Sequence, residues 1–342
     1  MQIRIKNKKQ QLIDAYGREI RSLRFSITNR CNLNCIYCHC EGEERAKEIS
    51  TDKIAKSEIS AEFIIAIARV ASDYFDIRRV KFSGGEPLMR ADLADIVQGM
   101  RDIEDNISVT TNGVFLSKYA RALADAGLDR VNVSLDSLNE ERYDFVTRSR
   151  NNLSSVIEGI YSAIDAGLTP VKLNMVLLNG INDDEVVSMM DFVRECNKRG
   201  AGGEGEGGEG GESVILQLIE LIPSFGAGPH TMSKYTVDFS KLESELKTKA
   251  SAIKTRRLQH RRKYFVDGVE VEVVHPIANT AFCANCSRLR ITSDGKIKPC
   301  LLRNDNLVPI ESVDERHIRS RLKLAMQYRK PFFGKDLDNH KI

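Results

Sequence analysis

Cys31-Asn-Leu-Asn-Cys35-Ile-Tyr-Cys38 brings three cysteines together at the spacing C-x3-C-x2-C, with an aromatic residue before the last of them. A structural zinc site uses four ligands, and a closed four-iron cluster is also held by four cysteines. Three thiolates on a four-iron cluster leave one iron open to an external ligand. The alternative is a zinc loop that borrows a fourth ligand from His39 or Cys40. The rest of the chain has to separate these two interpretations.

The composition is that of a globular chain with its cysteines gathered for metal binding. The 342 residues are 42% hydrophobic, enough for one large or two ordinary domains. No apolar run predicts a membrane span, and residues 1–11 lack the apolar core of an export signal. Six of the eight cysteines fall in two groups, which indicates metal ligation in a reducing compartment and predicts a cytoplasmic protein. The net charge of +3 is too weak to argue for a nucleic-acid partner.

Strand patterns and helix patterns alternate along the first two thirds of the chain. The expected strands are 23–28, 79–83, 107–111, 130–136, 171–177 and 214–220. The expected helices are 60–75 with Ser60 as N-cap, 91–102, 116–126, 153–166, and 183–199 with Asn182 or Asp183 as N-cap. Such repeated units favour a parallel sheet with helical crossovers. Polar and glycine motifs follow the strands, where barrel enzymes place their chemistry. Six units therefore predict an α/β fold, a partial (β/α)6 barrel.

The later part of the chain changes character. Residues 200–212 are a run of Gly and Glu, expected to be a disordered insertion within a barrel spanning 1–222. Residues 223–342 are expected to form a C-terminal domain. Within it, residues 238–263 carry nine lysines and arginines. We interpret this run as a solvated helix face, with a phosphate-attracting surface as the alternative.

A second set of three cysteines, Cys283, Cys286 and Cys300, has the spacing C-x2-C-x13-C. A zinc ribbon would show C-x2-C twice, so two three-cysteine sets suggest two clusters, each with an open iron. Arg288 and Arg290 lie two apart on an expected strand, and both side chains therefore leave the same face. Paired guanidinium groups beside an open cluster suit an anionic substrate, although ordinary surface ion pairs are the alternative.

Six motifs, in order from about residue 12 to about residue 330, resemble the GTP 3′,8-cyclases, the molybdenum cofactor biosynthesis protein A family of radical S-adenosylmethionine (SAM) enzymes. They are Leu23-Arg-x-Ser-x-Thr-x-Arg-Cys31, Ser83-Gly-Gly-Glu-Pro-Leu-Met-Arg90, Thr110-Thr-Asn-Gly113, Val131-Asn-Val-Ser-Leu-Asp136, Asn179-Gly-Ile-Asn-Asp183 and Phe282-Cys-x-x-Cys-x-Arg-Leu-Arg290. The last motif distinguishes this family from other radical SAM enzymes that carry a second cluster.

The resemblance implies SAM and two 4Fe-4S clusters as cofactors. Cys31, Cys35 and Cys38 would hold the cluster that binds SAM, and the C-terminal extension would hold the second cluster through Cys283, Cys286 and Cys300. The SAM contacts would be Tyr37, Gly85, Ser134 and Ile222. The GTP contacts would be Arg24, Lys81, Thr110, Lys172, Arg288 and Arg290, with guanine on the open iron of the second cluster.

The implied reaction cyclises GTP to (8S)-3′,8-cyclo-7,8-dihydroguanosine 5′-triphosphate, the first step of molybdenum cofactor biosynthesis. A 5′-deoxyadenosyl radical, released from SAM by one electron, would remove hydrogen from the ribose C3′. The ribose radical would then attack C8 of guanine, with no side chain acting as a classical acid or base. The resemblance also implies a TIM-type barrel, a homodimer, an electron donor, and cyclic pyranopterin monophosphate synthase as the downstream partner.

The chain departs from the pattern of many relatives at several positions. Lys81 stands where many relatives have arginine, and Arg79 stands where many have lysine. Gln217 stands where many relatives have an arginine. Ile222 replaces a methionine, and the chain ends at Ile342 without the two terminal glycines of many relatives. The absence of the two glycines bears on how the reaction starts more than on the substrate.

Two other functions remain open on the sequence. One is a radical SAM enzyme that acts on a peptide or another small molecule through an auxiliary cluster, against which Arg288 and Arg290 argue. The other is an iron–sulfur or zinc protein that binds nucleic acid through residues 241–263. Such a protein would not need Gly84-Gly-Glu-Pro87 beside the first cysteines. The sequence assigns no role to Cys40 or Cys196.

Overall fold

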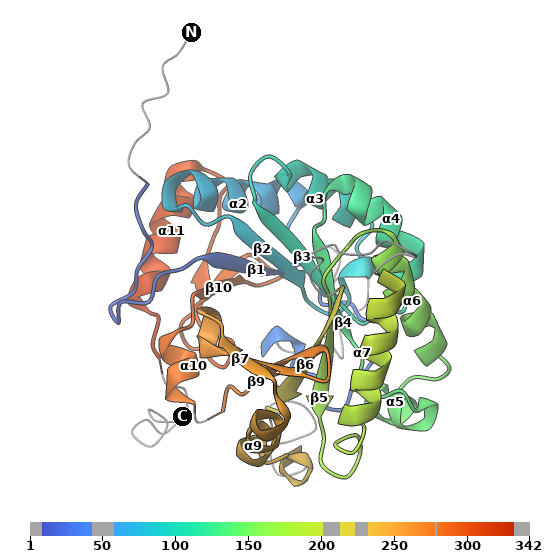
Figure 1. The fold of residues 1–342 in the computed structure, drawn as a ribbon. Helices are drawn as coiled ribbons and strands as arrows, with labels where there is room; N and C mark the ends of the chain where they lie inside the picture. The colour runs from blue at the N-terminus through green and yellow to red at the C-terminus, as the bar shows by residue number, and fades with distance from the viewer. Residues whose placement is uncertain (1–8, 43–57, 201–212, 223–231, 278, 332–342) are drawn as a thin grey trace.

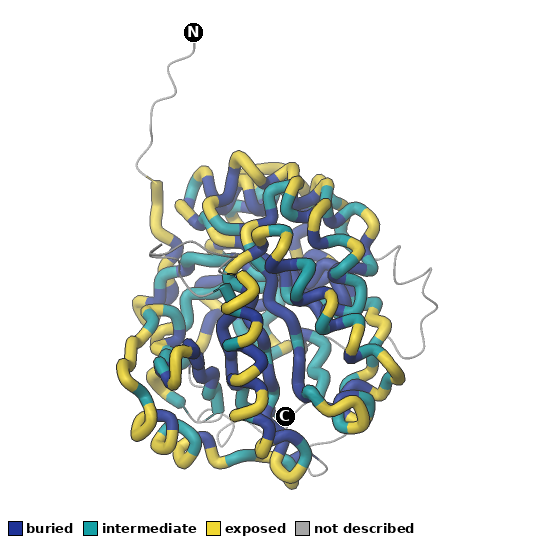
Figure 2. The backbone as a smooth tube through the Cα atoms, turned by 45° about the vertical axis from the view of Figure 1, so that its right-hand side comes forward, coloured by how far each residue is buried: buried dark blue, intermediate teal, exposed yellow. Residues whose placement is uncertain are grey.

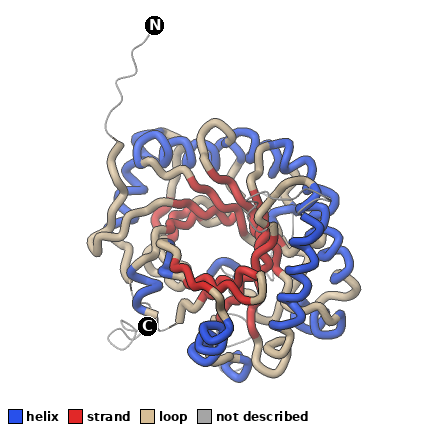
Figure 3. Tube along the Cα trace, in the orientation of Figure 1, coloured by secondary structure: helices blue, strands red, loops and turns tan. Residues whose placement is uncertain are grey.

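Six parallel strands form the centre of the computed structural model, which describes residues 9–42, 58–200, 213–222, 232–277 and 279–331. The strands are β1 (Ser22–Ser26), β2 (Arg79–Ser83), β3 (Asn106–Thr111), β4 (Arg130–Ser134), β5 (Val171–Leu177) and β6 (Val214–Glu220), in this order across the sheet. The sheet curves, with the helices outside it (Figure 1; Figure 3). The α/β fold with six parallel strands confirms the expectation from the sequence.

Helices connect these strands close to where the sequence predicts them. The crossover helices are α2 (Ala61–Phe75), α3 (Leu93–Met100), α4 (Leu116–Ala126), α5 (Glu140–Thr147), α6 (Leu153–Asp165) and α7 (Val186–Gly200). The Ser60 hydroxyl accepts from the Phe63 N–H at 3.2 Å, so the predicted N-cap of α2 is confirmed. Gly127 ends α4 in the left-handed region (φ 104°), a conformation that glycine adopts without a Cβ penalty.

The helices differ from the sequence predictions in four ways. Neither Asn182 nor Asp183 caps α7, which begins three residues later; the Asn182 amide instead donates to the carbonyl oxygens of Asp136 and Val176. The sequence interpretation also missed α5, whose apolar stripe is weak. The basic run is α-helical in α9 (Phe239–Lys249), and after it the chain forms a hairpin whose turn includes a short 3-10 helix at Leu258–His260. The C-terminal helices α10 (Thr280–Ala284) and α11 (Glu315–Gln327) were not predicted.

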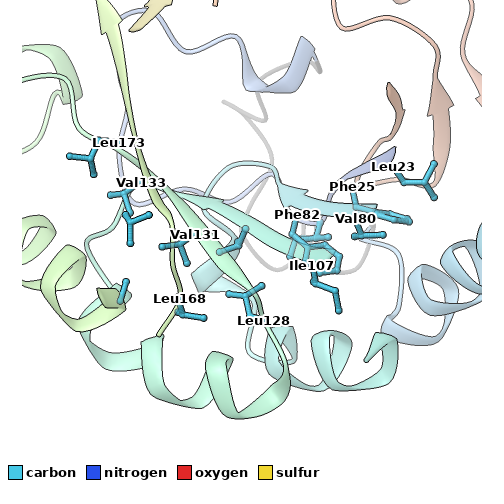
Figure 4. Close-up of a cluster of buried hydrophobic side chains, with 14 of the residues drawn as sticks. Leu23, Phe25, Val80, Phe82, Ile107, Leu128, Val131, Val133, Leu168 and Leu173 are labelled. Atoms are coloured by element: carbon cyan, nitrogen blue, oxygen red, sulfur yellow. The ribbon is translucent and has the colours of Figure 1, made fainter. Parts of the chain in front are cut away.

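The two faces of the sheet differ in chemistry because side chains alternate along a strand. Apolar residues on the outer face, among them Leu23, Phe25, Val80, Phe82 and Val131, are buried under the helices (Figure 4). Burial of this layer is the main stabilising term of the fold, at about 25 cal/mol per Å² of apolar surface. Many of the alternate positions are polar and line the inner face of the sheet, with apolar exceptions such as Ile215 on β6. Figure 2 shows that buried residues concentrate on the strands and on the inward sides of the helices.

The segment after residue 222 extends the same sheet at both edges. On one side β9 (Val269–Val274) pairs parallel with β6 and continues antiparallel into β8 (Arg262–Val266) and β7 (Ala252–Thr255). On the other side β10 (Arg288–Ile291) pairs parallel with β1 and continues into β11 (Lys296–Lys298) and β12 (Val308–Pro309). The expected C-terminal domain therefore shares a continuous sheet with the barrel, and it adds side chains to the inner face from both edges.

Three remaining expectations concern the Gly/Glu run, membrane-spanning helices and Cys196. The Gly/Glu run lies outside the described residues from 201 onward, and so does the C-terminal tail from 332. Among the described helices, none is long and apolar enough to cross a membrane. Cys196 is fully buried in α7 as part of the hydrophobic core, which accounts for a cysteine that the motifs do not use.

Candidate functional site

The first cysteine loop is positioned by the turn that follows β2. The Gly85 N–H donates to the Thr28 carbonyl oxygen and the Glu86 N–H to that of Arg30, both at 2.7 Å. A Cβ on Gly85 would lie 2.1 Å from the Arg30 carbonyl oxygen, a distance that no side chain tolerates. Glycine therefore allows the turn to press against the backbone that leads into Cys31.

Glu86 joins three of the motifs through hydrogen bonds. Its buried carboxylate accepts from the Thr111 hydroxyl at 2.6 Å, the Asn112 N–H at 2.7 Å and the Leu88 N–H at 2.9 Å. Burial raises the pKa of Glu86 to about 7, although each of these donors lowers it. The Asn112 amide donates in turn to the Asn32 side chain at 2.8 Å. Glu86 thus holds the ends of β2 and β3 against the cysteine loop.

A second buried carboxylate holds the cysteine loop to β4. The Tyr37 hydroxyl donates to Asp136 Oδ2 at 2.6 Å, and the Val176 N–H donates to Oδ1 at 2.9 Å. Burial raises the pKa of Asp136 to about 6. The implied SAM contacts Tyr37 and Ser134 are therefore brought to the same end of the sheet, because Asp136 follows Ser134 by two residues. Ile222 is half-buried just after β6.

The structure brings the six implied GTP contacts onto the inner face of the sheet. Arg24 of β1 stands in register with Lys81 of β2 on one side and with Arg290 of β10 on the other. Arg288 lies two residues before Arg290 on the same strand, β10, which confirms that the two arginines share a face. The remaining two contacts are Thr110 on β3 and Lys172 on β5.

Two buried carboxylates, which the sequence analysis did not single out, organise these cations. Glu41 accepts from Arg24 Nη2, and its other oxygen lies 3.9 Å from Arg290 Nε. Burial raises the pKa of Glu41, but the two arginines outweigh it and hold this pKa at about 2. Glu272 of β9 accepts from Lys172. The sequence position of each glutamate could have identified it. A glutamate within an apolar strand, such as Glu272, or next to a metal-binding loop, such as Glu41, needs a cationic partner.

Lys81 and Arg288 carry positive charge without a matching carboxylate. Neither side chain forms an ion pair with any described residue. Burial lowers the pKa of Lys81 well below its usual range, and Arg288 and Arg24 lower it further. Burial and the neighbouring charges of Arg290 and Arg24 act on the pKa of Arg288 in the same direction. Such a concentration of like charge favours binding of a polyanion.

The second cysteine loop is anchored by a buried charged triad. Asp14 pairs with Arg18 at 2.7 Å and with Arg329 at 2.9 Å, and all three side chains are buried. Arg18 donates to the carbonyl oxygen of Cys283 at 3.2 Å, and Arg329 donates to that of Cys286. Both ends of the chain therefore hold this loop. The third cysteine of the set, Cys300, follows β11.

The six cysteines of the two sets, all of which the structure describes, form no disulfide, so their thiols are available as metal ligands. Among the described residues, no three His, Cys, Asp or Glu side chains converge as one metal ion would require, although Cys40 Sγ lies 3.8 Å from Cys38 Sγ. A 4Fe-4S cluster would take each of the three thiolates on a different iron. Burial, then the charges of Asp136, Cys38 and Cys31, raises the pKa of Cys35. Coordination to iron would reverse this shift, since a metal-bound thiol is deprotonated.

The residues that differ from the family pattern lie at different places in the sheet. Lys81 is the residue that stands beside Arg24, whereas Arg79 lies exposed at the start of β2. Gln217 is buried on β6 and stands in register with Glu272. The basic run is only partly a solvated face, because Arg256 and Arg261 point inward to Glu272. This orientation removes two charges from the surface that a nucleic-acid partner would contact.

Comparison with known families divides the chain in two. Residues 25–193 match the radical SAM superfamily, and residues 214–335 match the family described as Molybdenum Cofactor Synthesis C. A probable GTP 3′,8-cyclase of Methanosarcina mazei is 48% identical, over 96% of this chain and 92% of the relative. A probable GTP 3′,8-cyclase of Archaeoglobus fulgidus is 41% identical, over 94% of this chain and 99% of the relative.

Solved structures agree with the fold. Streptococcus suis SuiB bound to S-adenosylmethionine has a TM-score of 0.59 at 17% identity, covering 82% of this chain and 60% of that one. The structure of anSMEcpe with bound AdoMet has a TM-score of 0.55 at 16% identity, covering 88% of this chain and 76% of that one. At this identity the likeness concerns the fold alone.

Proposed function

The chain belongs to the GTP 3′,8-cyclases of the radical SAM superfamily, and from this premise we propose that it cyclises GTP to (8S)-3′,8-cyclo-7,8-dihydroguanosine 5′-triphosphate in the first step of molybdenum cofactor biosynthesis. The observation that carries the proposal is the excess of cations on the inner face, between one three-cysteine loop and the other. A triphosphate would supply the anionic partner that Lys81 and Arg288 do not have among the described residues.

The residues of the first loop would bind SAM and its cluster. Cys31, Cys35 and Cys38 would ligate a 4Fe-4S cluster with one open iron, and Tyr37 would lie against the bound SAM together with Gly85, Ser134 and Ile222. When bound, this cluster supplies the electron that splits SAM and so provides the radical for the ribose C3′. The chain's own contribution is placement, because Asp136 and Glu86 fix the loop against two strand ends.

The residues of the second loop would hold the other end of the substrate site. Cys283, Cys286 and Cys300 would ligate a second 4Fe-4S cluster, which would bind the guanine. Arg288 and Arg290 follow Cys286 on β10, so a cluster at this loop would set the distance from the base to the phosphates. Arg24, Lys81, Thr110 and Lys172 would complete the binding of GTP from the facing strands. Both reactants would thus be held in contact and away from water.

The setting of the reaction follows from its chemistry. Oxygen-sensitive clusters require a reducing compartment, so we place the protein in the cytoplasm with a reduced one-electron donor as partner. A downstream enzyme, cyclic pyranopterin monophosphate synthase, would use the cyclised nucleotide. A homodimer is the expected assembly.

An anaerobic assay tests this function. Protein reconstituted with iron and sulfide should bind about eight irons, and the Cys283/Cys286/Cys300 triple alanine variant should bind about four. With SAM, dithionite and GTP, the parent should form the cyclised nucleotide and 5′-deoxyadenosine. Formation of 5′-deoxyadenosine with GTP left intact would argue against GTP as the substrate. An unchanged iron content in the triple variant would argue against the second cluster.

A further inference from the structure

Glu272 on β9 collects three cations around one carboxylate. Lys172 Nζ lies 2.5 Å from Oε2, Arg256 Nη1 lies 2.9 Å from the same oxygen, and Arg261 Nη1 lies 3.1 Å from Oε1. The Glu272 side chain is fully buried, and the exposed fractions of the Lys172 and Arg261 side chains are 10% and 9%. One carboxylate and three cations leave a local excess of two positive charges.

This excess is more than a structural role requires. A buried carboxylate is satisfied by one well-placed cation, and each further buried cation adds desolvation cost and repulsion. The repulsion appears in the pKa values: burial lowers the pKa of Lys172 to about 8, Glu272 raises it, and Arg256 and Arg261 lower it again. Such an arrangement is stabilised when an anion of at least two charges joins it.

The turn that carries Arg256 and Arg261 has an energetically unfavourable backbone conformation. Gln259 and His260 lie in the left-handed region at φ 58° and 52°, although neither is glycine. The Gln259 N–H donates to the Asn285 carbonyl oxygen at 2.8 Å, which fastens the turn to the second cysteine loop. The Arg261 guanidinium lies 5.7 Å from the ring centroid of Phe282, beside the same loop.

The charge of Arg261 acts on the cations of β1 and β10. Its charge contributes to lowering the pKa of Arg24 and that of Arg288, after burial and closer charges. The three guanidinium groups are therefore electrostatic neighbours, although they come from β1, β10 and the turn before β8. An anion held by Arg24 and Arg288 comes within the field of Arg261.

We propose that Arg256 and Arg261, positioned by Glu272, bind the triphosphate of the nucleotide substrate from the β9 side of the inner face, opposite β1 and β10. The inference rests on the proposed function for the identity of the nucleotide. It adds two residues that the motifs do not contain and assigns Glu272 as a positioning residue. Glu272 holds both guanidinium groups in place, and Arg261 Nη2 also donates to Gln259 Oε1. The buried Nε of Arg261 has no hydrogen-bond partner among the described residues and is left for a phosphate oxygen.

The test compares ligands that differ in phosphate content. Binding of GTP, guanosine and inorganic tripolyphosphate is measured anaerobically on the reconstituted parent and on Arg261→Gln and Arg256→Gln. A charge-assisted hydrogen bond of roughly 1.5–3 kcal/mol corresponds to a loss of about tenfold to a hundredfold. Arg261→Gln should weaken GTP and tripolyphosphate by that factor and guanosine by less than about twofold. Arg256→Gln should do so less strongly, because a third of its side chain is exposed.

Matched variants separate the proposal from a loss of fold. Arg257→Gln changes the exposed neighbour of Arg256 and should leave all three affinities unchanged. Arg261→Lys keeps the charge and should recover part of the affinity for tripolyphosphate. Equal weakening of GTP and guanosine in Arg261→Gln, or no weakening of GTP, would overturn the proposal. Tripolyphosphate binding that depends on Arg261, in a parent that does not cyclise GTP, would instead support the anion site and refute the cyclase assignment.

Discussion

The Tyr37 hydroxyl lies 2.6 Å from Asp136 Oδ2 and ties the middle of the first cysteine loop to the end of β4. Asp136 is buried and also accepts from the Val176 N–H on β5, so one carboxylate joins the loop to two neighbouring strands. Burial raises the pKa of Tyr37 above its usual range, so the hydroxyl stays protonated and donates. The loop that presents Cys35 and Cys38 is thus fixed to the sheet that presents the substrate contacts.

Tyr37→Phe should loosen this connection. Removal of the hydroxyl leaves a buried carboxylate with one donor fewer, a loss of about 1–3 kcal/mol. We expect SAM binding to weaken severalfold while iron content stays at the parent value, because no cysteine is changed. Tyr328→Phe, at an exposed side chain, serves as the control and should behave as the parent. Equal SAM affinity in Tyr37→Phe and the parent, measured by equilibrium binding, would show that the hydrogen bond does not position the loop.

Asp14→Asn should affect the second cysteine loop alone. The substitution leaves Arg18 and Arg329 buried without a carboxylate, which costs on the order of 3–5 kcal/mol. Their hold on the Cys283 and Cys286 carbonyl groups should weaken with it. The expected result is lower stability and an iron content that falls toward about four, with SAM cleavage retained.

The control for this substitution is a surface ion pair. Lys9 and Asp76 lie 2.9 Å apart with the aspartate largely exposed, so Asp76→Asn should cost less than about 1 kcal/mol. Full iron content in Asp14→Asn would contradict the role of the triad. Loss of SAM cleavage together with the iron would show that the damage is not confined to the second loop.

Glu104 predicts a pH dependence of stability that is independent of catalysis. Its buried carboxylate oxygens have no hydrogen-bond partner in the part of the chain that the structure describes, and burial raises its pKa to about 8. Because the folded pKa lies above the unfolded value, the folded state binds more protons between about pH 4.5 and 8. Stability from this group is therefore lost as the pH rises through that window, by a few kcal/mol at most.

Glu104→Gln removes the titration and should make stability less dependent on pH. Denaturant unfolding at pH 5.5 and pH 8.5 measures the difference. The gain of the variant over the parent should be larger at the higher pH. A gain of the same size at both pH values would mean that Glu104 does not titrate in this range.

The sequence was sufficient for the six central parallel strands and for the elements of the site that depend on local pattern. The i, i+2 spacing placed Arg288 and Arg290 on one face, whereas Arg24 and Lys81 were named through the family resemblance. Glu272 could not be assigned in advance, because its three partners come from β5 and from a turn that reaches the inner face only in the folded chain. Asp14 and Arg329 are likewise 315 residues apart and meet only in tertiary structure.

Part of the basic run was misjudged for the same reason. Lysines and arginines in residues 238–263 give no periodic signal that separates solvated from buried side chains. The left-handed backbone of Gln259 and His260, which directs two of the arginines inward, has no glycine to reveal it. The extension of the barrel by β9 and β10 was also beyond local pattern, because strand order depends on long-range pairing.

Transfer of deuterium from GTP labelled at the ribose C3′ tests the central claim most directly. The reconstituted parent is incubated anaerobically with SAM, dithionite and the labelled nucleotide, beside Arg290→Ala as the variant that weakens substrate binding. The account predicts one deuterium in the 5′-deoxyadenosine of the parent, together with cyclised nucleotide, and unlabelled 5′-deoxyadenosine with little cyclised product from Arg290→Ala. Unlabelled 5′-deoxyadenosine from the parent at saturating GTP would contradict the account, because the radical would then not react at the ribose C3′ of GTP.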